Sequence, residues 1–498
     1  MLRHERAANF RGTAGRLLHE VSLIDTLLAE QAALTAVDRF SAWHEAGAGI
    51  HSRRSYHELV PLQLPGAGEQ FSFEVNLDQC TACKACVAAC HSLNGLDDDE
   101  SWRDVGYLVA EDAPYRQSVP TTCHHCVEPA CLHGCPVLAY EKSPVTGIVR
   151  HLDDQCIGCS YCILKCPYDV PKYNRKRGIV RKCDMCSQRL GAGEAPACVQ
   201  ACPNEAIGIR VVRTAAVAAN SKQPNARLLP YAVPSRYTQP STRFITAKTM
   251  PAGARSADAD NPPLEPAHLP LVAMLLLTQS AAGLFLFSND GPLLWLGFGL
   301  LMAGLAASVL HLGQPLKAWR SFLGWRRSWL SREIIAFGVW APAGFAAAMG
   351  WIPSLVAAVV GLTAVFCSVM VYVDTRRPFW AWPSTATKFF GTVLVLGAAT
   401  EAISSPSLAG PAGLLVLTKL GLENAALHRA NPQMARTLLL LSGRAGIAAR
   451  LRNLLALAGV GLVFLSPTAA LLLWMAGEVL ERLVFFRAAA AWRMPGAA

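Results

Sequence analysis

The sequence predicts two structural classes in one chain: a small α+β domain rich in cysteine, and after it an all-α bundle of eight membrane-spanning helices. Three observations predict this division. Sixteen of the 17 cysteines in the 498 residues lie between Cys80 and Cys202. Apolar runs of membrane-spanning length follow one another after residue 268, and a stretch with eight prolines separates the two regions. We therefore divide the chain into an N-terminal extension (1–70), the cysteine domain (71–212), a linker (213–268) and the helical bundle (269–490).

The cysteines form four groups of four with short, regular gaps. The groups are Cys80, Cys83, Cys86 and Cys90; Cys123, Cys126, Cys131 and Cys135; Cys156, Cys159, Cys162 and Cys166; and Cys183, Cys186, Cys198 and Cys202. The first and third have the C-x2-C-x2-C-x3-C spacing of bacterial ferredoxins, in which three thiolates hold one iron-sulfur cluster and the fourth reaches a neighbouring cluster. Tetrahedral zinc usually takes two separated cysteine pairs, so the third cysteine of each group would be surplus. Disulfides require an oxidising compartment, and no secretory signal peptide is visible.

These quartets resemble those of the four-cluster ferredoxin-like subunits of membrane-bound molybdopterin oxidoreductases, such as the dimethyl sulfoxide, polysulfide and nitrate reductases and formate dehydrogenases. The resemblance covers roughly residues 70 to 210. It implies a ferredoxin-like fold with four 4Fe-4S clusters, in which the first quartet pairs with the fourth and the second with the third. The implied ligand sets are set A (Cys80, Cys83, Cys86, Cys202), set B (Cys183, Cys186, Cys198, Cys90), set C (Cys123, Cys126, Cys131, Cys166) and set D (Cys156, Cys159, Cys162, Cys135).

Short strands are expected between the quartets. FSFEVNL precedes Cys80, TGIVRHL precedes Cys156 and RGIVRKC enters the fourth quartet, which predicts small β-hairpins with short helices. Because clusters would supply most of the core, loss of iron should unfold the domain. An acidic run at 97–100 is expected to be a solvated loop, with a docking patch as the alternative. A basic group at 172–182 either raises the reduction potential of a cluster or forms a solvated face, and the sequence favours neither.

The first 70 residues predict one or two amphipathic helices followed by a linker. Apolar residues from Leu17 to Phe40 recur mostly at three- to four-residue steps. Packing on the cysteine domain is the simpler interpretation, and docking on a partner subunit is the alternative. The proline-rich stretch at 213–268 is expected to be extended, without a cooperative domain of its own.

Eight apolar runs have the length of about 17 to 25 residues that crosses a bilayer. They cover 269–288, 291–312, 332–351, 353–373, 386–405, 408–428, 449–465 and 467–487. Their connections alternate between basic and nearly uncharged, and the basic ones predict that both termini and the cysteine domain are cytoplasmic. We therefore expect a multi-pass protein of a bacterial inner membrane. The net charge of +10 is explained by this topology, and nucleic-acid binding is not expected.

A histidine and a glutamate at the cytoplasmic end of the bundle form the predicted quinol site. His311 ends the second run in VLHLGQP, and Glu333 begins the third in RRSWLSREI. These motifs and the gap between them resemble the anchor subunit of dimethyl sulfoxide reductase, which implies menaquinol binding by both residues. Quinol oxidation releases two protons, for which imidazole and carboxylate are suitable acceptors. Hydrated helix ends are the alternative, and Gln314, Trp319 and Arg332 are weaker candidates for the same pocket.

Four other charged residues in the apolar runs predict ion pairs within single helices. Lys419 and Glu423 are four residues apart, as are Glu478 and Arg482, so each pair could share one helix face. Structural ion pairs are the simpler interpretation. A proton path through the membrane is the alternative.

No haem is expected, because two haems would need four axial histidines and only His268, His311 and His428 follow residue 260. We interpret the chain as a non-catalytic electron-transfer and anchor subunit that passes electrons between menaquinol or ubiquinol and a molybdopterin (bis-MGD) catalytic subunit. The polypeptide returns toward the bundle through the fourth quartet, which favours that quartet's cluster as the nearest to the membrane. Reverse flow from a donor such as sulfite or formate into quinone, and a quinone-linked ion pump, are the alternatives.

Overall fold

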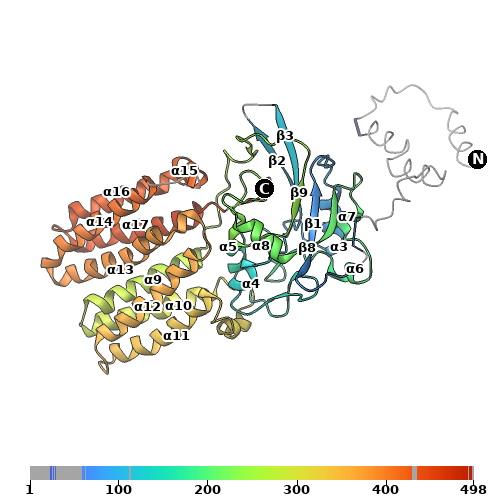
Figure 1. Cartoon of the computed structure of the whole chain (residues 1–498). Helices are drawn as coiled ribbons and strands as arrows, with labels where there is room; N and C mark the ends of the chain where they lie inside the picture. The colour runs from blue at the N-terminus through green and yellow to red at the C-terminus, as the bar shows by residue number, and fades with distance from the viewer. Residues whose placement is uncertain are drawn as a thin grey trace, which may run out of the picture. The chain divides into compact units, whose positions relative to one another are not determined.

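The computed structural model describes residues 59–495 except 62, 111–113, 429–433 and 492, together with Leu23, Ile24, Thr26 and Ala29. The chain divides into two units, Met1–Glu58 and Leu59–Ala498. The amphipathic helices expected at 17–40 therefore fall almost entirely outside the described residues. The second unit carries both the cysteine domain and the helical bundle (Figure 1).

The cysteine domain is α+β, and its described part contains four small sheets. Its strands are β1 (Glu69–Asn76), β2 (Asp104–Ala110), β3 (Tyr115–Thr121), β4 (Tyr140–Lys142), β5 (Val149–His151), β6 (Lys172–Asn174), β7 (Ile179–Arg181), β8 (Ile207–Arg213), β9 (Arg243–Ile245) and β10 (Arg255–Ser256). β1 lies between antiparallel β8 and parallel β9, and β2 lies between β3 and β10. The hairpins β4–β5 and β6–β7 complete the set. The strands expected before the first, third and fourth quartets are β1, β5 and β7.

Short helices accompany the cysteines, and two of them end where the sequence places a Cys-Pro pair. They are α3 (Ala85–Asn94), α4 (Ala130–Gly134), α5 (Tyr161–Lys165), α6 (Ser187–Gly191), α7 (Ala197–Gln200) and α8 (Thr214–Lys222). α4 and α5 stop just before Cys135 and Cys166, each of which precedes a proline and has extended backbone. Proline forces this conformation on the residue before it and cannot continue a helix. The second and third quartets therefore turn from helix to loop at their fourth cysteine.

Residues 213–268, expected to be an extended linker, contribute to the fold of the cysteine domain. They form α8, the 3-10 helix η3 (Ser235–Tyr237), β9 and β10. Leu229, Ala232 and Val233 are buried in the core that also holds Phe73. This segment is held on the cysteine domain by single buried apolar side chains and by the pairings of β9 with β1 and of β10 with β2. Neither kind of contact produces a periodic pattern in the sequence.

The acidic run, expected to be a solvated loop, pairs with the basic group. Glu100 is only 2% exposed and accepts hydrogen bonds from Arg181 Nη1 at 3.1 Å and Asn174 Nδ2 at 2.9 Å. Nearer the surface, Lys176 forms an ion pair with Asp97. These contacts join the loop after α3 to the β6–β7 hairpin. The expectation of a solvated loop holds for Asp98 and Asp99, which are exposed, and was wrong for Glu100.

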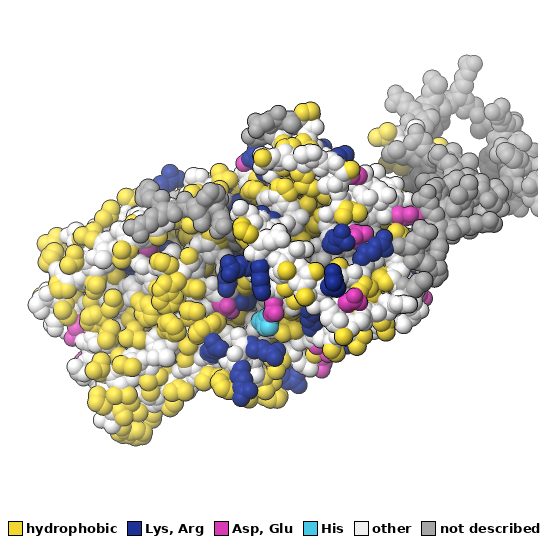
Figure 2. Space-filling model, in the orientation of Figure 1, with side chains coloured by type: hydrophobic (Ala, Val, Ile, Leu, Met, Phe, Trp, Pro, Cys, Tyr) yellow, Lys and Arg dark blue, Asp and Glu magenta, His cyan; other side chains and the backbone are white. Residues whose placement is uncertain are grey.

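Helices occupy all eight apolar runs of the C-terminal region, and one further short helix lies between the sixth and seventh runs. They are α9 (Leu269–Phe287), α10 (Gly291–Val309), α11 (Trp329–Ala348), α12 (Ser354–Val373), α13 (Trp382–Ser404), α14 (Ala409–His428), α15 (Ala435–Ser442), α16 (Gly446–Leu462) and α17 (Pro467–Arg487), with 3-10 helices η4 (Pro315–Phe322), η5 (Pro378–Trp380) and η6 (Pro406–Leu408). Among the described helices, α9, α10, α12 and α13 are long and apolar enough to cross a membrane. A fifth span results if α15 and α16, which meet at a 72° bend, count as one. Apolar side chains predominate on the face of the bundle that Figure 2 shows, as expected of a membrane-integral protein.

Candidate functional site

Each quartet bends around its cysteines through residues with left-handed backbone. This conformation is unfavourable for residues other than glycine and is concentrated at functional sites. In the first and third quartets it recurs at matching positions between the cysteines, at Ala82, Lys84, Gly158 and Ser160. It also recurs three residues after the last cysteine of the second, third and fourth quartets, at Leu138, Asp169 and Glu205. Cysteine spacing, rather than the identity of the intervening side chains, therefore shapes these loops.

Backbone amides point at cysteine sulfurs. Ala139 and Ala206 each donate an N–H to the Sγ of the cysteine four residues earlier, at 3.2 and 3.3 Å. Gly158 and Met185 each donate to the Sγ of the cysteine two residues earlier, at 3.4 Å. Hydrogen bonds to the sulfurs help to set the potential of an iron-sulfur cluster. The fold thus presents donors where bound thiolates would use them.

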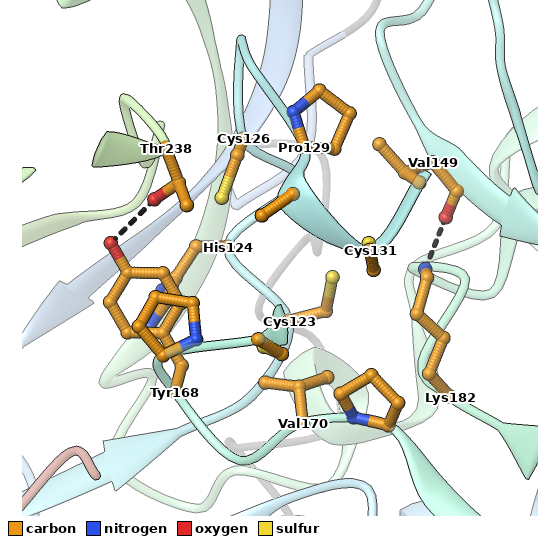
Figure 3. Close-up of a pocket in the computed structure, with 14 residues that line it drawn as sticks. Cys123, His124, Cys126, Pro129, Cys131, Val149, Tyr168, Val170, Lys182 and Thr238 are labelled. Atoms are coloured by element: carbon orange, nitrogen blue, oxygen red, sulfur yellow. Dashed lines mark hydrogen bonds between the residues drawn. The ribbon is translucent and has the colours of Figure 1, made fainter. Parts of the chain in front are cut away.

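The four cysteines of set C line one cavity (Figure 3). Three come from the second quartet and Cys166 comes from the third. Tyr168 and Thr238, hydrogen-bonded to each other at 2.8 Å, form part of the wall. Across the cavity, Lys182 Nζ donates to the carbonyl of Val149. Four sulfurs around one enclosed space fit a 4Fe-4S cluster.

The four cysteines of set A line a second cavity. Cys202 of the fourth quartet joins the first three cysteines of the first quartet there, and Cys83 is exposed. Asn204 donates to Thr81 Oγ1 at 2.9 Å at the edge of this cavity. Set A is therefore enclosed on one side and reaches the protein surface on the other.

Neighbouring thiols show where the fourth cysteines of sets B and D lie. Burial raises the pKa of Cys90 to about 12, and the thiols of Cys198 and Cys186 add to the rise. Burial also raises the pKa of Cys135 to about 11, with a further contribution from the thiol of Cys156. Cys90 thus lies among the cysteines of the fourth quartet, and Cys135 lies among those of the third. Metal ligation must deprotonate such thiols, so cluster binding is coupled to folding.

The four sets follow one another in a row. Burial raises the pKa of Cys86 in set A to about 11, and among neighbouring thiols Cys198 of set B contributes most to the rise. Burial raises the pKa of Cys183 in set B, and among the neighbouring thiols Cys123 of set C contributes most to the rise. Buried Tyr140 lies beside cysteines of both sets C and D. The order is therefore A, B, C and D.

Cations are buried between neighbouring sets. Arg103, 1% exposed, lies among thiols of sets A and B. Lys182, 3% exposed, lies between sets B and C; burial would lower its pKa, but the neighbouring thiols raise it above its ordinary value. His124, which lines the cavity of set C, has its pKa lowered to about 3 by burial and then by Arg103, so it is neutral. Arg103 and His124 were not predicted from the sequence, where only the position of His124 between two cysteines could have indicated a role.

Set D, rather than the fourth quartet, lies against the helical bundle. Tyr161, between Cys159 and Cys162, belongs to the apolar core of the bundle and donates its hydroxyl to the carbonyl of Val371 at 2.9 Å. Lys165 forms an ion pair with Asp374, at 2.7 Å, at the end of α12. The expectation that the fourth quartet approaches the membrane most closely was therefore wrong, because that quartet lies beyond sets C and D in the row.

The HLG motif supplies a close backbone contact at this junction. Gly313 lies against Gly178 and Gly158, and a Cβ at residue 313 would collide with the carbonyl group of Gly178. The amide of Gln314 donates to the carbonyl of Ile157 at 3.0 Å. The glycine of the motif therefore lets the segment after His311 approach the loop of set D.

His311 and Glu333 lie at the end of the bundle that faces set D. His311 follows α10, is partly buried, and donates Nδ1–H to the carbonyl of Ser308. Glu333 lies on α11, is 5% exposed, and accepts a hydrogen bond from Ser368 on α12. No hydrogen bond or ion pair joins these two described side chains to each other. Buried Tyr161 links the site to set D, because its pKa is raised by burial and by nearby carboxylates that include Glu333.

The weaker candidates for the quinol pocket have other roles. Gln314 Nε2 donates to the carbonyl of Arg177 in the cysteine domain at 2.8 Å. Arg332 donates to the carbonyl of Trp325 at 3.0 Å and stacks on Trp329. Trp319 is 62% exposed. These side chains hold the junction or face outward.

Seven charged side chains are buried together inside the bundle. They are Lys388 on α13, Lys419 and Glu423 on α14, Arg452 on α16, and Glu478, Glu481 and Arg482 on α17. Lys419 lies 3.6 Å from Glu423, as expected, but it binds Glu478 more closely, at 2.5 Å. Arg482 pairs with Glu481 rather than with Glu478, so that predicted pair was wrong.

Most ion pairs of this charge network connect different helices. The sequence predicts pairs only within single helices. Lys388 contacts Glu481 at 3.0 Å, and Arg452 pairs with Glu423. Arg482 also donates to Gln279 on α9 at 2.6 Å. Apart from the pair on α14, these ion pairs join different helices or adjacent residues, which helical spacing alone does not predict.

Comparisons with known proteins match the two regions separately. Residues 115–212 match the family described as a 4Fe-4S dicluster domain, and residues 266–421 match the family described as the DMSO reductase anchor subunit. The sequence is 35% identical over 150 residues to the B chain of the anaerobic dimethyl sulfoxide reductase of Haemophilus influenzae, covering 28% of this protein and 73% of that one. It is 36% identical over 148 residues to the protein of the same name from Escherichia coli K12, covering 28% and 72%. The hydrogenase-2 operon protein HybA of Escherichia coli O157:H7 is 34% identical over 160 residues, covering 26% and 48%.

Proposed function

Because this protein belongs to the family of anaerobic dimethyl sulfoxide reductase B subunits, with the anchor of such reductases joined to it in one polypeptide, we propose that it passes electrons between a membrane quinol and a molybdopterin (bis-MGD) catalytic subunit. Menaquinol and ubiquinol are the candidate donors. The protein itself is not the catalytic subunit. Its two parts are the electron path and the membrane anchor.

The observation that supports this proposal best is the continuous row of cysteine sets from the anchor to the protein surface. Set D packs against the bundle beside Tyr161, and set A opens at the surface through Cys83. Four 4Fe-4S clusters at these sets would carry one electron at a time along this path. The cavities of sets A and C and the buried cations between the sets fit such anionic groups.

The quinol would bind beside His311 and Glu333, at the end of the bundle next to set D. Glu333 is held by Ser368 and buried, and His311 is oriented through its Nδ1 by a backbone carbonyl. The other imidazole nitrogen and the carboxylate would each accept one hydroxyl proton. Electrons would pass from this site to set D close to Tyr161, which is buried in the core of the bundle and whose pKa is raised by burial and by carboxylates that include Glu333.

The catalytic subunit would dock at the opposite end, where set A reaches the surface. Eight helices would cross a bacterial inner membrane, with the cysteine domain on the cytoplasmic side. The basic connections lie at the end of the bundle that carries the cysteine domain: Lys317 and Arg320 donate to the carbonyl of Asp154, and Arg377 pairs with Glu265 at 3.6 Å. By the positive-inside rule this end is cytoplasmic.

Variants of the quinol site test the proposal. Removing a general base costs about 10²- to 10⁴-fold in rate, so His311→Gln and Glu333→Gln should slow quinol-dependent reduction of the clusters to that extent. Iron content should stay near about sixteen atoms per chain, the total for four cubanes. Thr363→Val, at an exposed position of α12, is the matched control. Unchanged quinol oxidation in the double variant, or purification without a large molybdenum subunit, would contradict the proposal.

A second candidate function is ion translocation driven by quinone chemistry. The seven buried charges of the bundle favour it, because ionisable groups inside membranes often mark ion pathways. In liposomes, a translocating complex should move more protons than the two that each quinol releases, and Glu478→Gln should abolish this excess while electron transfer continues. Turnover with no more than two protons per quinol would assign the network a structural role.

A further inference from the structure

The guanidinium of Arg103 is buried without a hydrogen-bond partner. Arg103 immediately precedes β2 and is 1% exposed, and neither Nη1 nor Nη2 has a partner among the described residues. Its guanidinium lies 4.9 Å from the centre of the Phe73 ring. A buried charge without a partner is costly, so such a group marks an interaction that the polypeptide alone does not supply.

The groups around this guanidinium are cysteine thiols from two different sets. Cys86 belongs to set A, and Cys198, Cys183 and Cys90 belong to set B. A nearby buried arginine shows the contrast: Arg181 pairs with Glu100 at 3.1 Å. Arg181 therefore has a carboxylate partner inside the protein, whereas the acidic groups near Arg103 are thiols, which become negative when they bind iron.

We propose that Arg103 is a positioning residue for electron transfer, whose guanidinium donates N–H···S hydrogen bonds to the clusters of both sets A and B and raises the reduction potentials of both. The proposal rests on the proposed function, because it requires clusters at these two sets. Each cluster gains one electron on reduction and no covalent bond forms or breaks. Its negative charge increases, so a fixed cation stabilises the reduced form.

One cation between two clusters also links their potentials. The planar guanidinium carries several donors in a fixed fork, so it can contact groups on two sides, whereas a lysine ammonium is a single point charge. Lys182, between sets B and C, differs in this respect because its ammonium already donates to the carbonyls of Val149 and Cys183. Arg103 should therefore affect sets A and B together and leave sets C and D unchanged.

Redox titration of the purified complex, followed by electron paramagnetic resonance, tests this inference. Arg103→Gln should lower the equilibrium constant for reduction of clusters A and B at least tenfold, which for one electron corresponds to about 59 mV. Arg103→Lys, which keeps the charge, should restore part of the shift. Arg116→Gln, at an exposed position on β3, removes one positive charge from the surface and should change no potential. Unchanged potentials in Arg103→Gln, with full iron content, would overturn the inference and leave the proposed function intact.

A measurement on the unaltered protein decides the question if Arg103→Gln fails to assemble. Arginine labelled with ¹⁵N in its guanidinium should give a hyperfine coupling to the reduced clusters A and B in pulsed electron paramagnetic resonance. Absence of that coupling in fully reduced complex would overturn the inference. Absence of four clusters by iron and sulfide analysis would overturn the proposed function instead.

Discussion

In the helical bundle, buried cations are matched by carboxylates on the same or a neighbouring helix, whereas in the cysteine domain Arg103 lies among thiols. Lys419 contacts both Glu423 and Glu478, and Arg482 contacts Glu481. No carboxylate contacts Arg103 among the described residues. Each of the four buried cations of the charge network therefore has a carboxylate partner among the network's three buried glutamates, whereas Arg103 lacks one and anionic clusters would balance its charge.

This difference explains how the two regions depend on their surroundings. The ion pairs of the bundle form between its own helices and need only that these helices pack. The core of the cysteine domain is built from short strands and helices around the cysteines, and it includes Cys86, Cys90, Cys123, Cys183 and Cys198 among its buried residues. Such a core loses its centre when the clusters are removed.

Iron removal should produce the largest effect, and it tests the comparison directly. Chelation under reducing conditions should unfold the cysteine domain and leave the helices of the bundle folded. Limited proteolysis in detergent should then cut residues 59–256 while a helical C-terminal fragment survives, and circular dichroism should retain most of its helical signal. A domain that stays protease-resistant without iron would show that the polypeptide alone completes the core.

Breaking the ion pair between Lys419 and Glu478 should destabilise the bundle strongly. Glu478→Gln leaves a buried ammonium short of one partner, which costs about 3–5 kcal/mol for buried pairs. The double variant Lys419→Met with Glu478→Gln should lose less than the sum of the two single variants. The measurement is unfolding in detergent followed by tryptophan fluorescence. The reduction potentials of the clusters should not change, and a change would show that the two regions share one charge balance.

The four cysteine quartets could be found in the sequence because their spacing is a local pattern, and the assignment of ligands to four clusters stays a prediction. The long-range strand pairings could not be found in this way. β1 pairs with β9 about 170 residues later, through Val75 and Phe244. The residues around Leu229 were predicted to be a linker because they have no period of 2 or 3.6, and only the three-dimensional core shows that they are buried.

In the bundle, local sequence patterns likewise predict the helices but not the side-chain contacts between them. All eight apolar runs are helices, because hydrophobic length is a local property. The i, i+4 rule found the contact of Lys419 with Glu423 but assigned Arg482 to the wrong carboxylate, since it compares residues on one helix only. Lys388 and Arg452, on two other helices, complete the network. Charged residues in apolar runs could have been flagged, but their partners could not.

The junction between the two regions should tolerate little extra volume. In Gly313→Ala the new methyl group would collide with the backbone of Gly178, and overpacking of this kind costs about 1–3 kcal/mol. Reduction of the clusters by quinol should slow, while reduction by dithionite should not change. Gly299→Ala, on α10 where a Cβ meets open space, is the matched control. Equal rates in both variants would show that the close contact beside set D is dispensable for electron entry.

The smallest effect is expected at the surface ion pair between Lys176 and Asp97. Asp97→Asn removes this pair, whose lysine is largely exposed, while the neighbouring buried pair between Arg181 and Glu100 remains. Water and salt screen an exposed pair, so the thermal midpoint should stay within experimental error. Glu100→Gln should lower the midpoint clearly, because it leaves the buried guanidinium of Arg181 with one charged partner fewer. A similar decrease of the thermal midpoint in both variants would mean that the buried and the exposed pair contribute equally to stability. The acidic run would then act as one unit.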